Sequence, residues 1–149
     1  MARLSGSASI EIDASLERVW DEVRDVESTP EWQAGLDEMV VLERDDHGRP
    51  SLVRSETDAK VRRIKTVVRF RYDPPTRLSW SQQQGDLSKL DGAWLLEDLG
   101  SGRTRATYTL DGDPGRVLGM LVRGPVQDNL RAMFVDARPG ELKRRIEDR

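Results

Sequence analysis

Residues 60–72, KVRRIKTVVRFRY, are the stretch of this 149-residue chain that decides its fold. The side chains that alternate onto one face are Ile64, Thr66, Val68, Phe70 and Tyr72. The other face carries mainly arginine and lysine, and a period of two residues is typical of a β-strand with one buried face. This stretch therefore predicts a strand of an antiparallel sheet whose apolar face is covered by another layer.

Alternating segments continue on both sides of this strand. They predict strands over residues 7–13, 39–44, 51–58, 77–84, 89–97 and 103–110. Short segments rich in Gly, Pro and Asp separate most of them, as at residues 73–76, DPPT, and such segments favour tight turns. The sequence thus predicts a first strand followed later by six consecutive strands joined as hairpins.

Two helices are predicted between the first strand and the other six. Apolar residues recur at helical spacing from Leu16 to Asp25, and Ser15 is a suitable N-cap. A second, short helix is predicted over residues 29–32, with Thr29 as its cap and Pro30 as its first residue.

The period becomes helical again after residue 115. Pro125 is well placed as a first helical residue, and one apolar stripe then runs along the helix through Val126, Leu130, Met133, Phe134 and Ala137. The Pro139-Gly140 pair is expected to break or kink this helix, and residues 141–149 to form a frayed, charged helical tail. The predicted class is α+β, with a single domain over residues 1–149.

Residues 12–32, IDASLERVWDEVRDVESTPEW, resemble the opening of START-like (SRPBCC) domains, in the polyketide cyclase/dehydrase and lipid-transport group. The likeness continues through residues 92–94, residues 102–105 and the C-terminal helix. It implies a helix-grip fold: a curved antiparallel sheet of about seven strands wrapped around a long C-terminal helix, in the order β-α-α-β6-α. It also implies that the chain binds a small hydrophobic or aromatic molecule, such as a lipid, a quinone or a polyketide.

A pocket is expected between the sheet and the last helix, where the inward-facing side chains of both meet. The predicted ligand-binding residues are Val68, Phe70, Tyr72, Trp80, Gln82, Trp94, Tyr108, Leu130 and Phe134. Polar groups on an inward face are informative because their burial is unfavourable unless they are paired. Gly92 lies within a strand on this face, where glycine marks either a close approach or a bend.

A polyketide cyclase/dehydratase, or aromatase, is the alternative function. Its candidate catalytic residues are Tyr72, Tyr108, Arg123 and Arg131, which would position and polarise a substrate. The chain has no cysteine, and its one histidine, His47, falls in a predicted turn. The sequence therefore predicts no metal site, no cofactor and no Ser-His-Asp triad, and it favours binding over catalysis.

Charge and hydropathy limit the other partners. With 24 basic and 27 acidic residues the net charge is -3, which argues against nucleic-acid binding driven by overall charge. The basic strand face, including Arg69 and Arg71, leaves a ribosome- or RNA-associated domain as a third hypothesis. No apolar segment reaches the length of a membrane span and no signal peptide is recognisable, so a cytoplasmic location is expected. The oligomeric state stays open.

Overall fold

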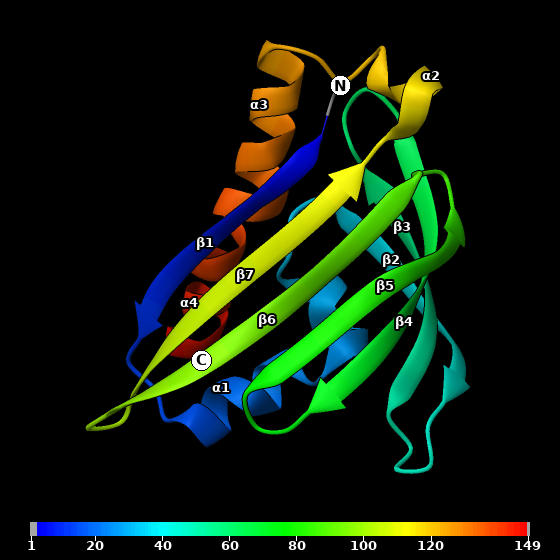
Figure 1. Cartoon of the computed structure of the whole chain (residues 1–149). Coiled ribbons are helices and arrows are strands. Elements are labelled where there is room, and N and C mark those ends of the chain that lie inside the picture. The colour runs from blue at the N-terminus through cyan, green and yellow to red at the C-terminus, as the bar shows by residue number, and fades with distance from the viewer. Residues whose placement is uncertain (1–2, 149) are drawn as a thin grey trace.

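A computed structural model describes residues 3–148 of the chain. Seven antiparallel strands form one sheet in the order β1-β7-β6-β5-β4-β3-β2 (Figure 1). Their bounds are β1 (Leu4–Ile12), β2 (Leu36–Arg44), β3 (Pro50–Asp58), β4 (Arg63–Asp73), β5 (Arg77–Gly85), β6 (Lys89–Gly100) and β7 (Arg103–Asp113). The predicted strands are confirmed, and several extend a few residues further than the alternation indicated.

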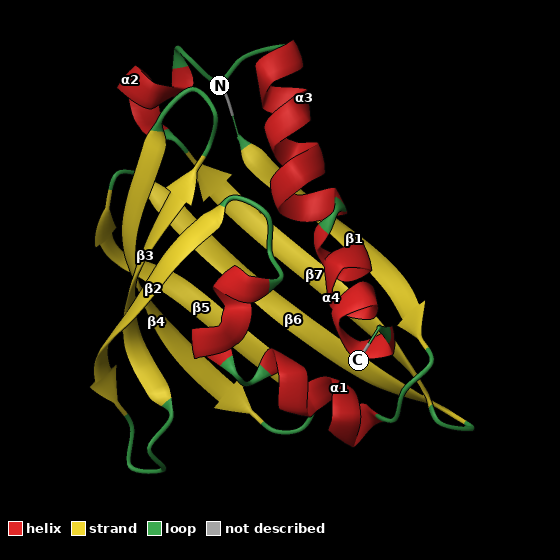
Figure 2. Ribbon diagram, turned by 180° about the vertical axis from the view of Figure 1, so that it is seen from behind, coloured by secondary structure: helices red, strands yellow, loops and turns green. Residues whose placement is uncertain are grey.

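The helices cover the inner, concave face of the sheet (Figure 2). They are α1 (Leu16–Val23), a 3₁₀ helix η1 (Val26–Glu31), α2 (Gly115–Gly119), α3 (Pro125–Arg131), a π-helical turn η2 (Ala132–Asp136) and α4 (Arg138–Glu147). The segment from α3 to α4 lies against β1 and β7, while α1 packs on β6 and η1 on β2. This is the helix-grip arrangement, with the predicted element order.

The first two helices begin for different reasons. The Ser15 hydroxyl accepts a hydrogen bond from the Arg18 amide at 3.2 Å, so Ser15 caps α1 as predicted. The start predicted for the second helix is wrong, because η1 begins after Asp25 and contains Pro30 in its interior. The Thr29 hydroxyl donates to the Val26 carbonyl at 2.7 Å, so it is held inside the 3₁₀ turn and does not act as a cap.

The C-terminal helix is long but not uniform. Pro125 is the first residue of α3, as predicted, and the π turn then separates α3 from α4. The predicted break in the helix therefore comes just before Pro139. Pro139 itself lies in the first turn of α4, where a proline costs no helical hydrogen bond. The expectation of a frayed tail is wrong, because Leu142 and Ile146 are buried in the main core.

Gly92 allows the Trp80 indole to lie directly against the backbone of β6. It pairs with Trp80 across β5 and β6, and the Trp80 indole occupies the space of a side chain at position 92. A Cβ added there would lie 2.4 Å from the indole ring. Of the two roles considered for this glycine, the structure shows close approach.

Candidate functional site

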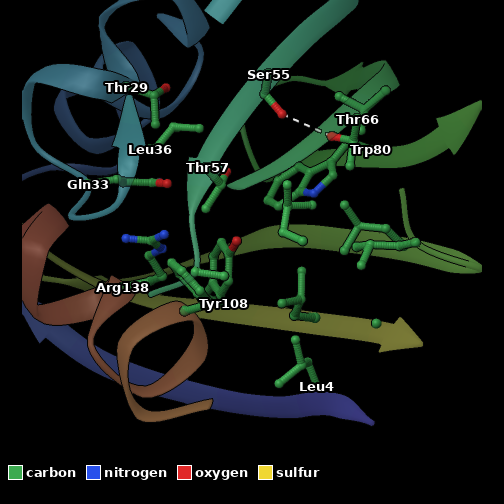
Figure 3. Close-up of a pocket in the computed structure, with 18 of the residues that line it drawn as sticks. Leu4, Thr29, Gln33, Leu36, Ser55, Thr57, Thr66, Trp80, Tyr108 and Arg138 are labelled. Carbon is green, nitrogen blue, oxygen red and sulfur yellow. Dashed lines mark hydrogen bonds between the residues drawn. The ribbon is translucent and has the colours of Figure 1, made fainter. Parts of the chain in front are cut away.

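A cavity of about 160 Å³ lies between the concave face of the sheet and the helices (Figure 3). Its wall includes seven of the nine predicted ligand-binding residues: Val68, Phe70, Trp80, Trp94, Tyr108, Leu130 and Phe134. The remaining wall is also mainly apolar, with a few polar groups that include those of Thr29, Gln33 and Arg138. A mainly apolar cavity of this size accommodates a molecule on the scale of a single aromatic ring.

Aromatic rings form a continuous chain along the wall. The Tyr108 ring meets the Trp94 ring edge to face, with centroids 4.8 Å apart, and lies 5.6 Å from the Trp80 ring. The ring centroids of Trp94 and Trp32 are 6.4 Å apart, and those of Trp80 and Phe70 are 5.8 Å apart. These separations are those of favourable aromatic pairs, so the wall is rigid and presents ring faces and edges to the cavity.

A buried ion pair closes the end of the cavity nearest α4. Arg138 and Glu141 are 4% and 7% exposed, and Arg138 Nη1 lies 2.8 Å from Glu141 Oε1. The same pair binds both polar groups of Ala34: Arg138 donates to its carbonyl and Glu141 accepts from its amide. The Arg138 guanidinium also lies 5.3 Å from the centroid of the Phe134 ring. The pair therefore holds the η1–β2 loop onto α4.

Two hydrogen-bond donors at this end have no partner among the described residues. They are Arg138 Nε and Trp32 Nε1, and both atoms are buried. Both residues belong to the cavity wall, and Figure 3 shows the Arg138 side chain reaching towards Gln33 and Tyr108. Because unpaired buried donors are rare and unfavourable, a hydrogen-bond acceptor that reached either of them would be stabilised.

Tyr108 contributes a hydroxyl group to the same wall as Arg138. Burial raises the pKa of Tyr108, and Arg138 acts in the opposite direction through its positive charge and a side-chain hydrogen bond. The hydroxyl therefore stays protonated at neutral pH and can donate a hydrogen bond. It is not suited to act as a base.

Tyr72 and Gln82 lie outside the cavity wall. The Tyr72 hydroxyl donates to the Pro50 carbonyl at 2.6 Å, and burial raises the pKa of Tyr72. Gln82 Nε2 donates to the Leu87 carbonyl at 2.8 Å. A register shift in the β4–β5 pairing at Val67 and Val68 interrupts the regular alternation beside Gln82, which period alone does not reveal. Both side chains thus stabilise neighbouring backbone.

Arg123 and Arg131 are not on the wall either. Arg123 is exposed, and Arg131 forms an exposed ion pair with Asp128 at 2.8 Å. The structure does not bring these arginines together with Tyr108. The basic face of β4 is partly neutralised: Arg63, Arg69 and Arg71 each have a carboxylate within 4.0 Å.

Arg138 is the site residue that sequence reasoning missed. It continues the i, i+4 spacing of Leu130 and Phe134, so it lies on the same face of the helical segment. The expected break at Pro139 and Gly140 ended the predicted stripe too early. Extending the four-residue spacing by one step would have found it.

Several solved structures resemble this chain over nearly its whole length. The START superfamily protein from Mycobacterium smegmatis has 24% identity and a TM-score of 0.83, with 97% of each chain covered. Protein TTHA0849 from Thermus thermophilus has 20% identity and a TM-score of 0.81, again with 97% of each chain covered. The ZhuI aromatase/cyclase from Streptomyces sp. R1128 has 18% identity and a TM-score of 0.75, covering 97% of this chain and 96% of the other. Among curated proteins, no sequence matched.

A curved sheet closed over a helix, with an apolar cavity between them, defines a helix-grip domain, and the START superfamily protein from Mycobacterium smegmatis has the same fold. The chain belongs to the family "Polyketide cyclase / dehydrase and lipid transport", whose model matches residues 12–137. The family predicted from residues 12–32 is thereby confirmed. Within residues 3–148 no helix has the length and apolar character needed to cross a membrane.

Proposed function

We propose that this chain binds a small, ring-containing apolar molecule that carries one hydrogen-bond-accepting oxygen. The observation that carries the proposal is the pair of unpaired buried donors, Arg138 Nε and Trp32 Nε1, in an otherwise apolar cavity. The wall would hold the ring by apolar and aromatic contact, and the donors would orient the oxygen.

A neutral carbonyl suits these donors better than a carboxylate. The charge of Arg138 is already balanced by Glu141 at 2.8 Å. A carboxylate at the same place would put a second negative charge beside one positive charge in a medium that solvates ions poorly. A ketone or aldehyde oxygen accepts the same hydrogen bonds without that cost.

Acetophenone and ethylbenzene test this proposal, because they share a ring and differ chiefly in the carbonyl. Quenching of tryptophan fluorescence on titration should saturate for both probes, with acetophenone binding about five- to ten-fold more tightly. Trp32→Phe should reduce this preference, whereas Trp20→Phe, which changes a buried indole away from the wall, should keep it. Equal affinity for both probes in the unmodified chain would contradict the proposal that Arg138 and Trp32 bind the carbonyl oxygen, which we call the carbonyl anchor.

Filling the cavity tests binding itself. Leu110→Trp places a larger side chain on the wall, and Leu95→Trp places the same side chain on a site that is 37% exposed. Binding of both probes should be lost in the first variant and kept in the second. Saturable binding that survives Leu110→Trp would show that the probes bind elsewhere.

Catalysis as an aromatase or cyclase is the second candidate, and Tyr108 is the observation that favours it. A protonated Tyr108 beside the carbonyl anchor could polarise a ketone and assist an intramolecular condensation. Tyr108→Phe should then slow turnover of a poly-β-ketone analogue about 100-fold or more. Tyr72→Phe is the matched control, because its hydroxyl is bound to Pro50 outside the wall. An equal effect of both substitutions would argue against a catalytic role of Tyr108.

A further inference from the structure

The segment around α2 exposes three large apolar side chains. Val117 is 74% exposed, Met120 64% and Leu121 52%, the three highest values among the large hydrophobic residues described. They occupy α2 and the turn that follows it. A group of this kind at one point of the surface is a typical mark of an interaction site.

This apolar tip adjoins the mouth of the cavity. Leu118 and Val122 from the same segment are buried, and both belong to the cavity wall. They form one apolar cluster with Ala59 of the β3–β4 loop. The next apolar residue of that loop, Val61, is a wall residue that is 41% exposed. Figure 1 shows the loop and α2 at the same end of the molecule.

Four cations accompany the apolar tip. Arg116 and Arg123 flank its apolar residues in sequence, and Lys60 and Arg62 flank Val61. All four are exposed, and none has a carboxylate within 4.0 Å among residues 3–148. On neighbouring β4, in contrast, Arg63 and Arg69 pair with carboxylates. The mouth therefore carries free positive charge although the whole chain has a net charge of -3.

The turn that presents Lys60 and Arg62 is held by its own backbone. The Ala59 amide donates to the Arg62 carbonyl at 3.0 Å, and the Lys60 amide donates to the Asp58 carboxylate at 2.8 Å. Lys60 has a φ of 70°, an unfavourable conformation for a residue other than glycine. A local conformation that keeps two free cations beside an apolar mouth points to a function of this turn.

We propose that the apolar tip and its four cations dock on the surface of an anionic bilayer, with the mouth facing the lipid. Protruding apolar side chains suit insertion at the boundary between headgroups and acyl chains, and the cations suit anionic headgroups. A second copy of this chain fits poorly, because a symmetric contact would bring two sets of four cations together. One short helix and one turn also offer less area than a stable protein interface requires.

Docking in this orientation would let an apolar molecule pass between bilayer and cavity without crossing water. The inference does not depend on the carbonyl anchor, because it rests on the surface around the mouth. Its test measures vesicle binding in the absence of any cavity ligand, so it can fail while the proposed function stands, and the reverse also holds.

Co-sedimentation of the full chain with vesicles tests the proposal. Vesicles of phosphatidylcholine with phosphatidylglycerol should retain the protein, those of phosphatidylcholine alone should retain much less, and added salt should weaken binding. Arg116→Gln with Arg123→Gln should lower the partition coefficient about 25-fold, at about five-fold for each charge. Val117→Ser with Leu121→Ser should lower it at least as much.

Two matched double variants control for changes away from the mouth. Leu42→Ser with Leu95→Ser replaces two exposed apolar residues elsewhere, and Arg54→Gln with Arg77→Gln replaces two unpaired cations elsewhere. Both should bind like the unmodified chain, and circular dichroism should show that all variants are folded. No retention by anionic vesicles, or equal losses in tip and control variants, would overturn the proposal. So would a concentration-dependent dimer that the tip variants abolish.

Discussion

At one end of the cavity, Arg138 and Glu141 are buried among aromatic rings and hold the η1–β2 loop through Ala34. At the other end, α2 and the turn after it expose Val117 and Met120 beside unpaired cations. The first end is closed and its two buried charges are paired, although two buried donors lack partners. The second end is open and its apolar groups face solvent. We therefore expect the closed end to supply stability and, under the proposed function, ligand orientation, and the open end to supply access.

The largest effect is expected from the ion pair at the closed end. Arg138→Met leaves Glu141 buried without its partner and should lower the free energy of unfolding by about 3–5 kcal/mol. Arg131→Met breaks a pair of the same spacing and the same 2.8 Å separation on the surface, and should cost about 0–1 kcal/mol. Urea unfolding measures both.

Replacing both partners sharpens this test. Arg138→Met combined with Glu141→Leu removes the isolated charge, so it should be more stable than Arg138→Met alone. If the single variant were no less stable than Arg131→Met, the closed end would not be the stabilising end.

Removing apolar volume should distinguish the two ends next. Leu142→Ala acts in the fully buried core beside the closed end, and should cost an amount in the upper part of the range of about 2–5 kcal/mol. Leu118→Ala acts at the open end, where the short α2 can adjust, and should fall near the bottom of that range. The midpoint of chemical denaturation reports both, and a larger loss for Leu118→Ala would reverse the comparison.

Substitutions in the sheet between the two ends should lower the free energy of unfolding by less. Gly92→Ala adds a methyl group 2.4 Å from the Trp80 ring and should cost about 1–3 kcal/mol. Gly112→Ala is the matched control in β7, where the added carbon would lie 3.2 Å from the Leu4 carbonyl oxygen, and it should cost less. Equal melting temperatures for both variants would show that the Trp80 contact gives way easily.

The smallest effect is expected on the outer surface of β7. Hydrogen bonds from Lys89, Ser5 and Arg3 hold the pKa of Asp111 below its ordinary value of 3.8. Folding thus favours the ionised form, so its stabilising contribution is present above pH 3.8 and is lost as the pH falls below that value. The melting-temperature difference between the unmodified chain and Asp111→Asn should therefore shrink at acid pH. A difference that does not change with pH would contradict this assignment.

The fold could be predicted from sequence because its signals are local. Alternation along β4 and the turn at residues 73–76 each depend on a few neighbouring residues. Alternation along the strands also assigned Val68, Trp80 and Tyr108 to the inward face of the sheet, and all three line the cavity.

The closed end of the site could not be predicted in the same way. Tyr72 alternates onto the same strand face as Val68, but its hydroxyl is bound to Pro50, a contact between residues far apart in sequence. Arg138 is buried only because Glu141 and Ala34 meet it in three dimensions. Parity determines the face on which a side chain lies, but it does not determine which group that side chain contacts.

The strand order also limits the order in which the strands can join the sheet during folding. From β2 to β7 every strand pairs with its neighbour in sequence, so these hairpins close short loops. β1 instead pairs Leu4 with Gly112 and Ile12 with Thr104, so it must wait until β7, the last of the seven strands, has been synthesised. Because long loops cost more entropy to close, we expect β1 to join last, which pulsed hydrogen exchange would detect as late protection of its amides. Until then the edge of β7 stays open, although β1 is synthesised before the other six strands of the sheet.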